Sequence, residues 1–108
     1  MYNIQEVVGN NIRLFRQTRR LTQERLAELV NVSSSYIGYL ERGIRAPSLD
    51  LLVRIGITLE VEPTVLFRTT SEDTDPVLKK FNALVVGKDP IQIHFLYEVA
   101  VAYFESIK

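Results

Sequence analysis

Apolar residues recur every three or four positions along most of this chain, with polar residues between them. That spacing is typical of amphipathic helices rather than of strands. The first helix is expected over residues 4–19, with Gly9 inside it at a cost of about 1 kcal/mol relative to alanine. Two short helices joined by a tight turn are predicted next, within residues 21–43. The inward positions of the three helices are Val8, Ile12 and Phe15, then Leu26, Ala27 and Val30, then Ile37 and Leu40.

The residues that flank the two short helices suit helix ends and a tight turn. Thr22 and Ser33 stand just before the helical patterns, where a side-chain oxygen accepts hydrogen bonds from the first backbone N–H groups. Asn31 lies between the helices and tolerates the left-handed conformation that a sharp turn needs. Gly43 caps the second helix, and the small Ala27 lets the two helices cross closely. These features predict a helix-turn-helix whose second helix presents its outer face to solvent.

Four further helices are predicted downstream. Ser48 is expected to cap the first of them, and an acid followed by proline opens each of the other three, because proline at the first helical position lacks only an N–H that is not needed. Gly87 is expected to end the helix that begins near Pro76. The inward residues after Ser48 are Leu49, Leu52, Ile55, Gly56 and Leu59, and the dipeptides are Glu62-Pro63, Asp75-Pro76 and Asp89-Pro90.

A family resemblance rests on residues at fixed spacing: Gly9, Ile12, Arg13 and Arg16, then Leu21, Thr22, Gln23, Leu26 and Ala27, then Val32, Ser33, Ile37, Leu40, Glu41, Arg42 and Gly43, then Pro47, Ser48, Leu49 and Leu52, and finally Leu59, Val61, Pro63, Leu66 and Phe67. Through them, residues 9–67 resemble the lambda-repressor-like helix-turn-helix domain of the Cro/CI/Xre type. The resemblance implies an all-α fold with a five-helix DNA-binding domain at residues 1–68. The polar, poorly patterned residues that follow predict a linker at 69–75, and the last two predicted helices give a two-helix C-terminal extension at 76–108.

The resemblance also implies roles for individual residues. Arg16 on the first helix would form an ion pair with Glu41, which closes the second short helix, and a bidentate pair would hold the two helices together. Gln23 would touch a phosphate or help to place a base-reading side chain. With Ile37 and Leu40 inward, the residues that face DNA would be Ser34, Ser35, Gly38 and Tyr39. The simpler interpretation is that the serines only cap the helix and that Tyr39 covers the edge of the core.

The formal charge is zero overall but unevenly distributed. Residues 1–54 carry eight basic and five acidic side chains, which gives a formal charge of +3. Residues 55–108 carry five basic and eight acidic ones, which gives −3. A basic first half suits contacts with phosphates, which supply the salt-sensitive part of DNA affinity. Arg42 and Arg45, beside the glycine cap, are the favoured phosphate contacts. Arg19 and Arg20 fit either phosphate contact or simple solvation of a helix end.

The last helix, expected over residues 90–107, is apolar on nearly all sides. A short helix of that kind must be covered by other protein surface. We predict that self-association covers it, giving a homodimer; the alternative is that the helix packs back on its own DNA-binding domain. The expected interface residues are Phe81, Leu84, Phe95, Leu96, Val99 and Tyr103.

Several function classes are not expected. Without cysteine there is neither a disulfide framework nor a thiolate zinc site. His94 has no partner at ligand spacing, and no phosphate-binding glycine loop or nucleophile–base constellation is present, so neither metal, cofactor nor enzymatic activity is predicted. The first residues lack a signal-peptide pattern, and the apolar C-terminal run is interrupted by polar residues, so we expect a cytoplasmic protein without a membrane span.

Together these patterns predict a sequence-specific transcriptional regulator, a repressor that binds a palindromic operator in double-stranded DNA as a homodimer. The alternative is an antitoxin-like or antagonist-controlled interaction module whose tail captures a regulatory protein or peptide. A symmetric self-interface in the tail favours the first, whereas an apolar groove left open in the dimer favours the second.

Overall fold

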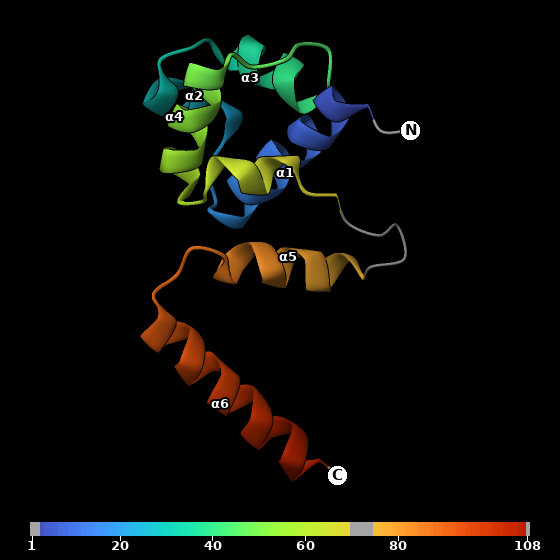
Figure 1. The fold of residues 1–108 in the computed structure, drawn as a ribbon, viewed down its shortest axis with the longest axis vertical. Helices are drawn as coiled ribbons and strands as arrows, with labels where there is room; N and C mark the ends of the chain where they lie inside the picture. The colour runs from blue at the N-terminus through green and yellow to red at the C-terminus, as the bar shows by residue number, and fades with distance from the viewer. Residues whose placement is uncertain (1–2, 70–74, 108) are drawn as a thin grey trace.

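The computed structural model describes residues 3–69 and 75–107, and the regular secondary structure in this part of the chain is all helical (Figure 1). The all-α fold class is therefore confirmed. The elements are α1 (Ile4–Thr18), α2 (Gln23–Val30), α3 (Ser34–Glu41), α4 (Leu49–Leu59), the 3-10 helix η1 (Pro63–Phe67), α5 (Pro76–Val85) and α6 (Pro90–Ser106).

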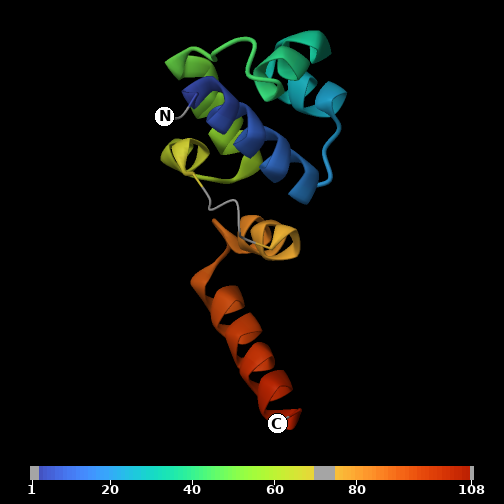
Figure 2. The ribbon, with the colours of Figure 1, turned by 90° about the vertical axis from the view of Figure 1, so that its right-hand side faces the viewer.

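Helices α1 to α4 and η1 form a bundle that we call the head, and it encloses the hydrophobic core (Figures 1 and 2). Each helix contributes side chains that are almost inaccessible to water, and burial of such side chains is the main driving force for packing. The largest fully buried residues are Ile12, Leu26, Ile37, Leu40, Ile55, Leu59, Leu66 and Val30. The predicted inward positions of α1, α2 and α3 are all buried.

The predicted turn between α2 and α3 and the predicted cap before each of these helices are confirmed. Thr22 accepts a hydrogen bond from the backbone N–H of Arg25, and Ser33 accepts one from that of Tyr36. Asn31 has φ of 62° and ψ of 48°, which is the left-handed conformation expected of it. These local bonds fix the angle at which α3 leaves the turn.

Two details of the later helices differ from expectation. Leu49, predicted to face inward, is 80% exposed, whereas Leu51 is buried and takes its place in the core. The cap explains this: Ser48 accepts from the N–H of Leu51, which leaves Leu49 at the outward start of the helix. Glu62 makes no side-chain cap bond, and the segment after it is a 3-10 helix, whereas Asp75 and Asp89 cap α5 and α6 as predicted.

Gly9 is required by packing rather than merely tolerated. A Cβ placed on Gly9 would lie 2.2 Å from the carbonyl oxygen of Leu40 and 2.8 Å from that of Glu41. The missing side chain thus allows α1 to lie directly against the end of α3. The propensity cost inside α1 is offset by this close approach.

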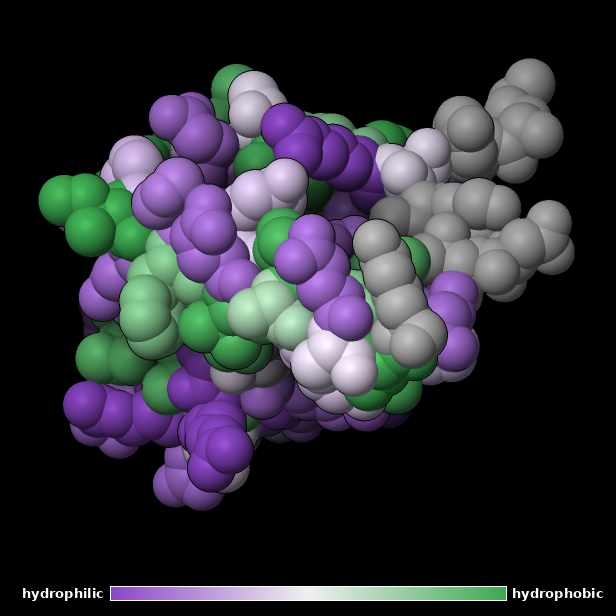
Figure 3. Space-filling model, turned by 90° about the horizontal axis from the view of Figure 1, so that it is seen from below, coloured by the Kyte–Doolittle hydropathy of each residue, from purple (hydrophilic) through white to green (hydrophobic). Residues whose placement is uncertain are grey.

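The two C-terminal helices differ in how they meet the head. Helix α5 lies across α1 and inserts Ala83 into the core. Helix α6 points away from the head, and none of its residues is buried (Figures 1 and 2). Viewed from the α6 end, hydrophobic and hydrophilic side chains are mixed on the exposed face (Figure 3). Of the helices described, none combines the length and apolar character that crossing a membrane requires.

Candidate nucleic-acid interface

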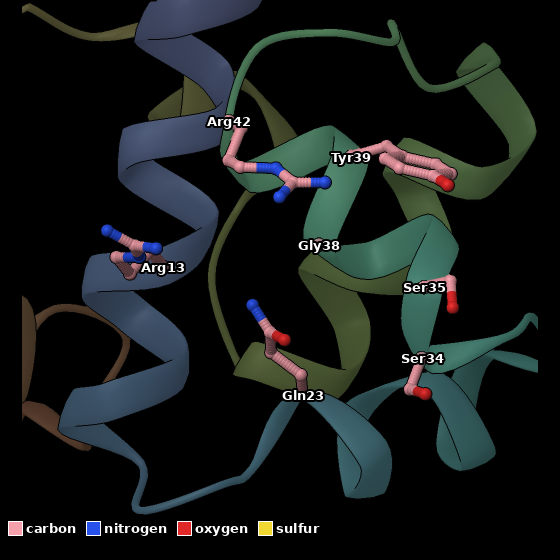
Figure 4. A pocket seen from close by; sticks show the side chains of 7 residues that line it. All are labelled: Arg13, Gln23, Ser34, Ser35, Gly38, Tyr39 and Arg42. Carbon is pink, nitrogen blue, oxygen red and sulfur yellow. The ribbon is translucent and has the colours of Figure 1, made fainter.

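Helix α3 has one buried face and one exposed face. Ile37 and Leu40 are held in the core, so the other side of the helix faces outward. There it borders a shallow pocket of about 380 Å³, to which α1 and α2 also contribute. Figure 4 shows Gln23 lying between Arg13 of α1 and the outward residues of α3. The pocket is lined by Arg13, Gln23, Ser34, Ser35, Gly38, Tyr39 and Arg42.

A buried ion pair fixes α3 against α1. Arg16 donates from Nε to Oε2 of Glu41 at 2.6 Å and from Nη2 to Oε1 at 2.9 Å. The Glu41 side chain is completely inaccessible to water, and that of Arg16 is only 10% exposed. Arg16 also donates from Nη1 to the carbonyl oxygen of Leu21 at 2.8 Å. This is the bidentate geometry in which a guanidinium holds a carboxylate most firmly.

Glu41 also accepts hydrogen bonds from the edge of the pocket. Gln23 donates from Nε2 to its Oε1 at 3.0 Å, and Arg13 donates from Nε to the same oxygen at 3.4 Å. Burial by itself would raise the pKa of Glu41, but the hydrogen bonds from Arg16 and Gln23, with the charge of Arg16, outweigh it and hold the pKa below its ordinary value. The family resemblance implied only the Arg16 contact, because Gln23 and Arg13 approach Glu41 through the tertiary fold.

The bond to Glu41 determines how Gln23 presents its amide. A carboxylate accepts but does not donate, so the NH₂ group must face Glu41. The Gln23 oxygen then lies toward α3, where a Cβ added to Gly38 would be 3.8 Å from it and 4.0 Å from the amide nitrogen. The absence of a side chain at Gly38 therefore leaves the oriented amide uncovered in the pocket (Figure 4).

The basic residues near α3 are not all at the pocket. Arg42 lies at its rim and stacks on Tyr39, with its guanidinium carbon 5.4 Å from the ring centroid. Arg45 is exposed in the loop after α3 and does not line the pocket. Arg19 is partly buried and its guanidinium bonds three backbone carbonyls of the same chain, so it fits neither the phosphate contact nor the simple solvation that were expected. Arg20 is exposed.

The residues expected at a dimer interface are all exposed in the single chain. A groove of about 500 Å³ lies where α5 meets α6 and is lined mainly by apolar side chains, among them Leu84, Phe95 and Leu96. The exposed fractions of the expected interface residues are 50% for Phe81, 47% for Leu84, 67% for Phe95, 41% for Leu96, 49% for Val99 and 56% for Tyr103.

His94 is exposed on α6, and Glu98 lies one turn away, contrary to the expectation that it has no partner at ligand spacing. Its Nε2 is 3.8 Å from Oε1 of Glu98, and both side chains are well exposed to water. Within residues 3–69 and 75–107, no group of three or more histidine, cysteine, aspartate or glutamate side chains is arranged to hold a metal ion.

Known proteins share both the sequence and the geometry of the head. Residues 12–66 match the helix-turn-helix family. The uncharacterized HTH-type transcriptional regulator Rv0474 of Mycobacterium tuberculosis is 41% identical over 59 residues, which are 55% of this chain and 42% of that protein. The HTH-type transcriptional regulator SlrR of Bacillus subtilis is 31% identical over 94 residues, which are 86% of this chain and 57% of that protein. The chain thus spans roughly half the length of these relatives.

A solved structure supports the same assignment. The restriction-modification controller protein C.AhdI from Aeromonas hydrophila superimposes with a TM-score of 0.58 and is 36% identical, covering 61% of this chain and all of that one. The matched region contains the α2–turn–α3 unit, its caps and the Arg16–Glu41 pair. The chain therefore belongs to the lambda-repressor-like helix-turn-helix family of the Cro/CI/Xre type.

Proposed function

We propose that this protein is a sequence-specific DNA-binding transcriptional regulator, a repressor that binds a two-fold symmetric operator as a homodimer. The observation that carries the proposal is the outward face of α3, where hydrogen-bonding and basic side chains border one open pocket. The opposite face of α3 is fixed by core packing and by the buried Arg16–Glu41 pair. A helix held in this way is a rigid probe for the DNA major groove.

The residues of the pocket suit two kinds of DNA contact. Ser34 and Ser35, at the start of α3, offer short hydroxyl groups that donate to or accept from base edges, and Gln23 adds an oriented amide beside them. Arg13 and Arg42, at the rim, provide charge for phosphates on either side of the groove. We assign Tyr39 to the boundary between the base contacts and the phosphate contacts. We assign Arg45 to a contact with a phosphate outside the pocket.

The proposed homodimer rests on the exposed apolar surface of α5 and α6. Helix α6 carries large apolar side chains around its circumference, yet it buries none of them within the chain. That α6 buries none of its residues against the head supports self-association over the predicted alternative, in which this helix packs back on its own head. A second copy offers the same apolar surface, and two-fold pairing would present two α3 helices to two half-sites.

The proposal is tested by the DNA that the protein retains. Purified protein is incubated with sheared genomic DNA near physiological salt, and the bound fragments are sequenced. A short palindrome is expected, and the double variant Ser34→Ala, Ser35→Ala should lose it because the hydroxyl contacts are gone. The control variant Ser106→Ala, at the end of α6, should retain the palindrome.

Recovery of fragments without a shared motif would contradict sequence-specific binding. Loss of binding in proportion to added salt, with no preference among sequences, would mean that the head contacts only the DNA backbone. That outcome would favour the second candidate, an interaction module whose apolar groove between α5 and α6 captures a partner protein. In that case an apolar groove left open in the dimer is expected.

A further inference from the structure

Arg19 joins three parts of the molecule that are distant in sequence. It follows the last turn of α1 and donates from Nε to the carbonyl oxygen of Leu59 at 3.0 Å. Its Nη1 donates to the carbonyl oxygen of Ala83 at 2.6 Å, and its Nη2 donates to that of Val86 at 3.0 Å. One guanidinium therefore bonds the end of α4 and the end of α5 at once.

The chemistry of these acceptors makes the junction strong. The last carbonyls of a helix lack partners in the helix and carry partial negative charge, so a cation stabilises both ends. The ring of Phe15 lies 5.7 Å below the guanidinium carbon and adds a cation–π contact. Burial lowers the pKa of Arg19, and the nearby charge of Glu60 partly opposes that shift.

The loop before α6 is held to the same place by two further contacts. Gly87 has φ of 82°, and a Cβ there would lie 2.1 Å from the carbonyl oxygen of Glu60, so the loop backbone rests directly on the end of α4. Lys88 Nζ lies 3.6 Å from the Glu60 carboxylate. The chain therefore leaves the head for α6 from an anchored point rather than from a free linker.

We propose that Arg19 is a positioning residue that fixes the direction of α6 relative to α3. The inference rests on the proposed function: if α6 forms the dimer, then the Arg19 junction sets the separation and angle of the two α3 helices. The operator would have to match that geometry, with half-sites about one helical turn of DNA, or a multiple of it, apart. Arg19 would then select half-site spacing without touching DNA.

The planar fork of arginine is essential to this role. Three bonds diverge from three nitrogens of one guanidinium to carbonyls on two helix ends. A lysine ammonium keeps the charge but lacks that rigid geometry, so Arg19→Lys should loosen the junction without removing a cation. The neighbouring Arg20, which is exposed, supplies a matched control in Arg20→Lys.

The first measurement needs no DNA. Because the chain has no cysteine, Glu24→Cys on α2 and Glu98→Cys on α6 introduce two unique sites for spin labels. Labelled protein is diluted with unlabelled protein, so that pulsed EPR reports the distance within one chain. We expect one narrow distribution for the parent and for Arg20→Lys, and a broader or shifted one for Arg19→Lys. An unchanged distribution in Arg19→Lys would overturn the proposal, provided that circular dichroism shows intact helices.

The second measurement uses the recovered operator with its half-sites moved apart in single base-pair steps. The parent should bind one spacing about tenfold better than a spacing half a turn away, because the heads must face the same side of the DNA. Arg19→Lys should bind a single half-site as well as the parent does, but discriminate little between spacings. A parent that shows no optimum would contradict the dimeric operator, while the spin-label distances would still decide whether Arg19 holds α6.

Discussion

The head and α6 are both rich in apolar residues, but they use them in opposite ways. In the head, apolar side chains from α1 to η1 are almost inaccessible to water, and a charged pair is buried among them. In α6, the large apolar side chains are exposed and none of the residues is buried. Apolar content alone therefore does not tell whether a helix is covered by its own chain. The head buries its apolar side chains within the chain, whereas α6 leaves apolar surface that we propose a second copy covers.

Helix α5 lies between these extremes. The side chain of Ala83 lies in the core, and the C-terminal end of α5 is held by Arg19. Helix α5 therefore packs as part of the head. Its other side exposes Phe81 and Leu84 next to α6. This arrangement divides the expected two-helix tail into an anchored helix and a projecting one. The residues most critical for folding should thus lie in the head, and those most critical for association in α6.

The largest expected effect is on the stability of the head. Glu41→Ala leaves the buried guanidinium of Arg16 without its partner, which should lower the free energy of unfolding by about 3–5 kcal/mol. Chemical denaturation followed by circular dichroism measures the change. The matched variant Glu98→Ala removes an exposed carboxylate from α6 and should change stability by less than about 0.5 kcal/mol. An equal loss of unfolding free energy in the two variants would contradict the difference between the head and α6.

The next effect is on association. Phe95→Glu places a charge on the apolar surface of α6, and a two-fold interface contains that change twice. If each copy of the change costs about 1.5 kcal/mol of association free energy, the dimer loses about 3 kcal/mol. Its dissociation constant then rises roughly a hundredfold. Sedimentation equilibrium measures the dissociation constant, and Ser106→Glu serves as the charge-matched control. A dimer that persists unchanged in Phe95→Glu would show that α6 does not form the interface.

A smaller effect should separate binding from stability on α3. Gly38→Ala is accommodated by the fold, because the nearest atoms of Gln23 lie at ordinary contact distance. Helix propensity then favours alanine by up to about 1 kcal/mol. DNA binding should weaken, since the new methyl covers the Gln23 amide. Thermal unfolding and DNA titration measure the two quantities. Unaltered DNA affinity in Gly38→Ala would contradict the role of the open pocket. As a control, Gly9→Ala should destabilise the head, because the added Cβ would overlap the Leu40 carbonyl.

The smallest effect is a dependence of stability on pH. The pKa of Glu41 is lower in the folded head than in the unfolded chain. Its contribution is therefore fully present above about pH 4.5 and is lost as the pH falls through the folded pKa. Urea denaturation at a series of pH values should show this loss in the parent. Glu41→Gln should be less stable throughout but lack this component, so an identical pH profile in both proteins would exclude Glu41 as its source.

Sequence alone determined the local structure of this protein. Helix periodicity, the caps at Thr22 and Ser33, the left-handed Asn31 and the Asp–Pro starts of α5 and α6 depend on neighbouring residues, and all were predictable. The outward face of α3 followed from the inward positions of Ile37 and Leu40. The Arg16–Glu41 contact was suggested by the family resemblance rather than by spacing.

Only the tertiary structure decided how those elements meet. The close approach at Gly9, the union of Gln23 and Arg13 with Glu41, and the bonds from Arg19 to Leu59, Ala83 and Val86 all join residues far apart in the chain. No local pattern predicts such contacts. By local pattern alone, a glycine is a weak helix position and an arginine at a helix end is expected to be solvated. The anchored α5 and the projecting α6 likewise arise from the shape of the assembled head.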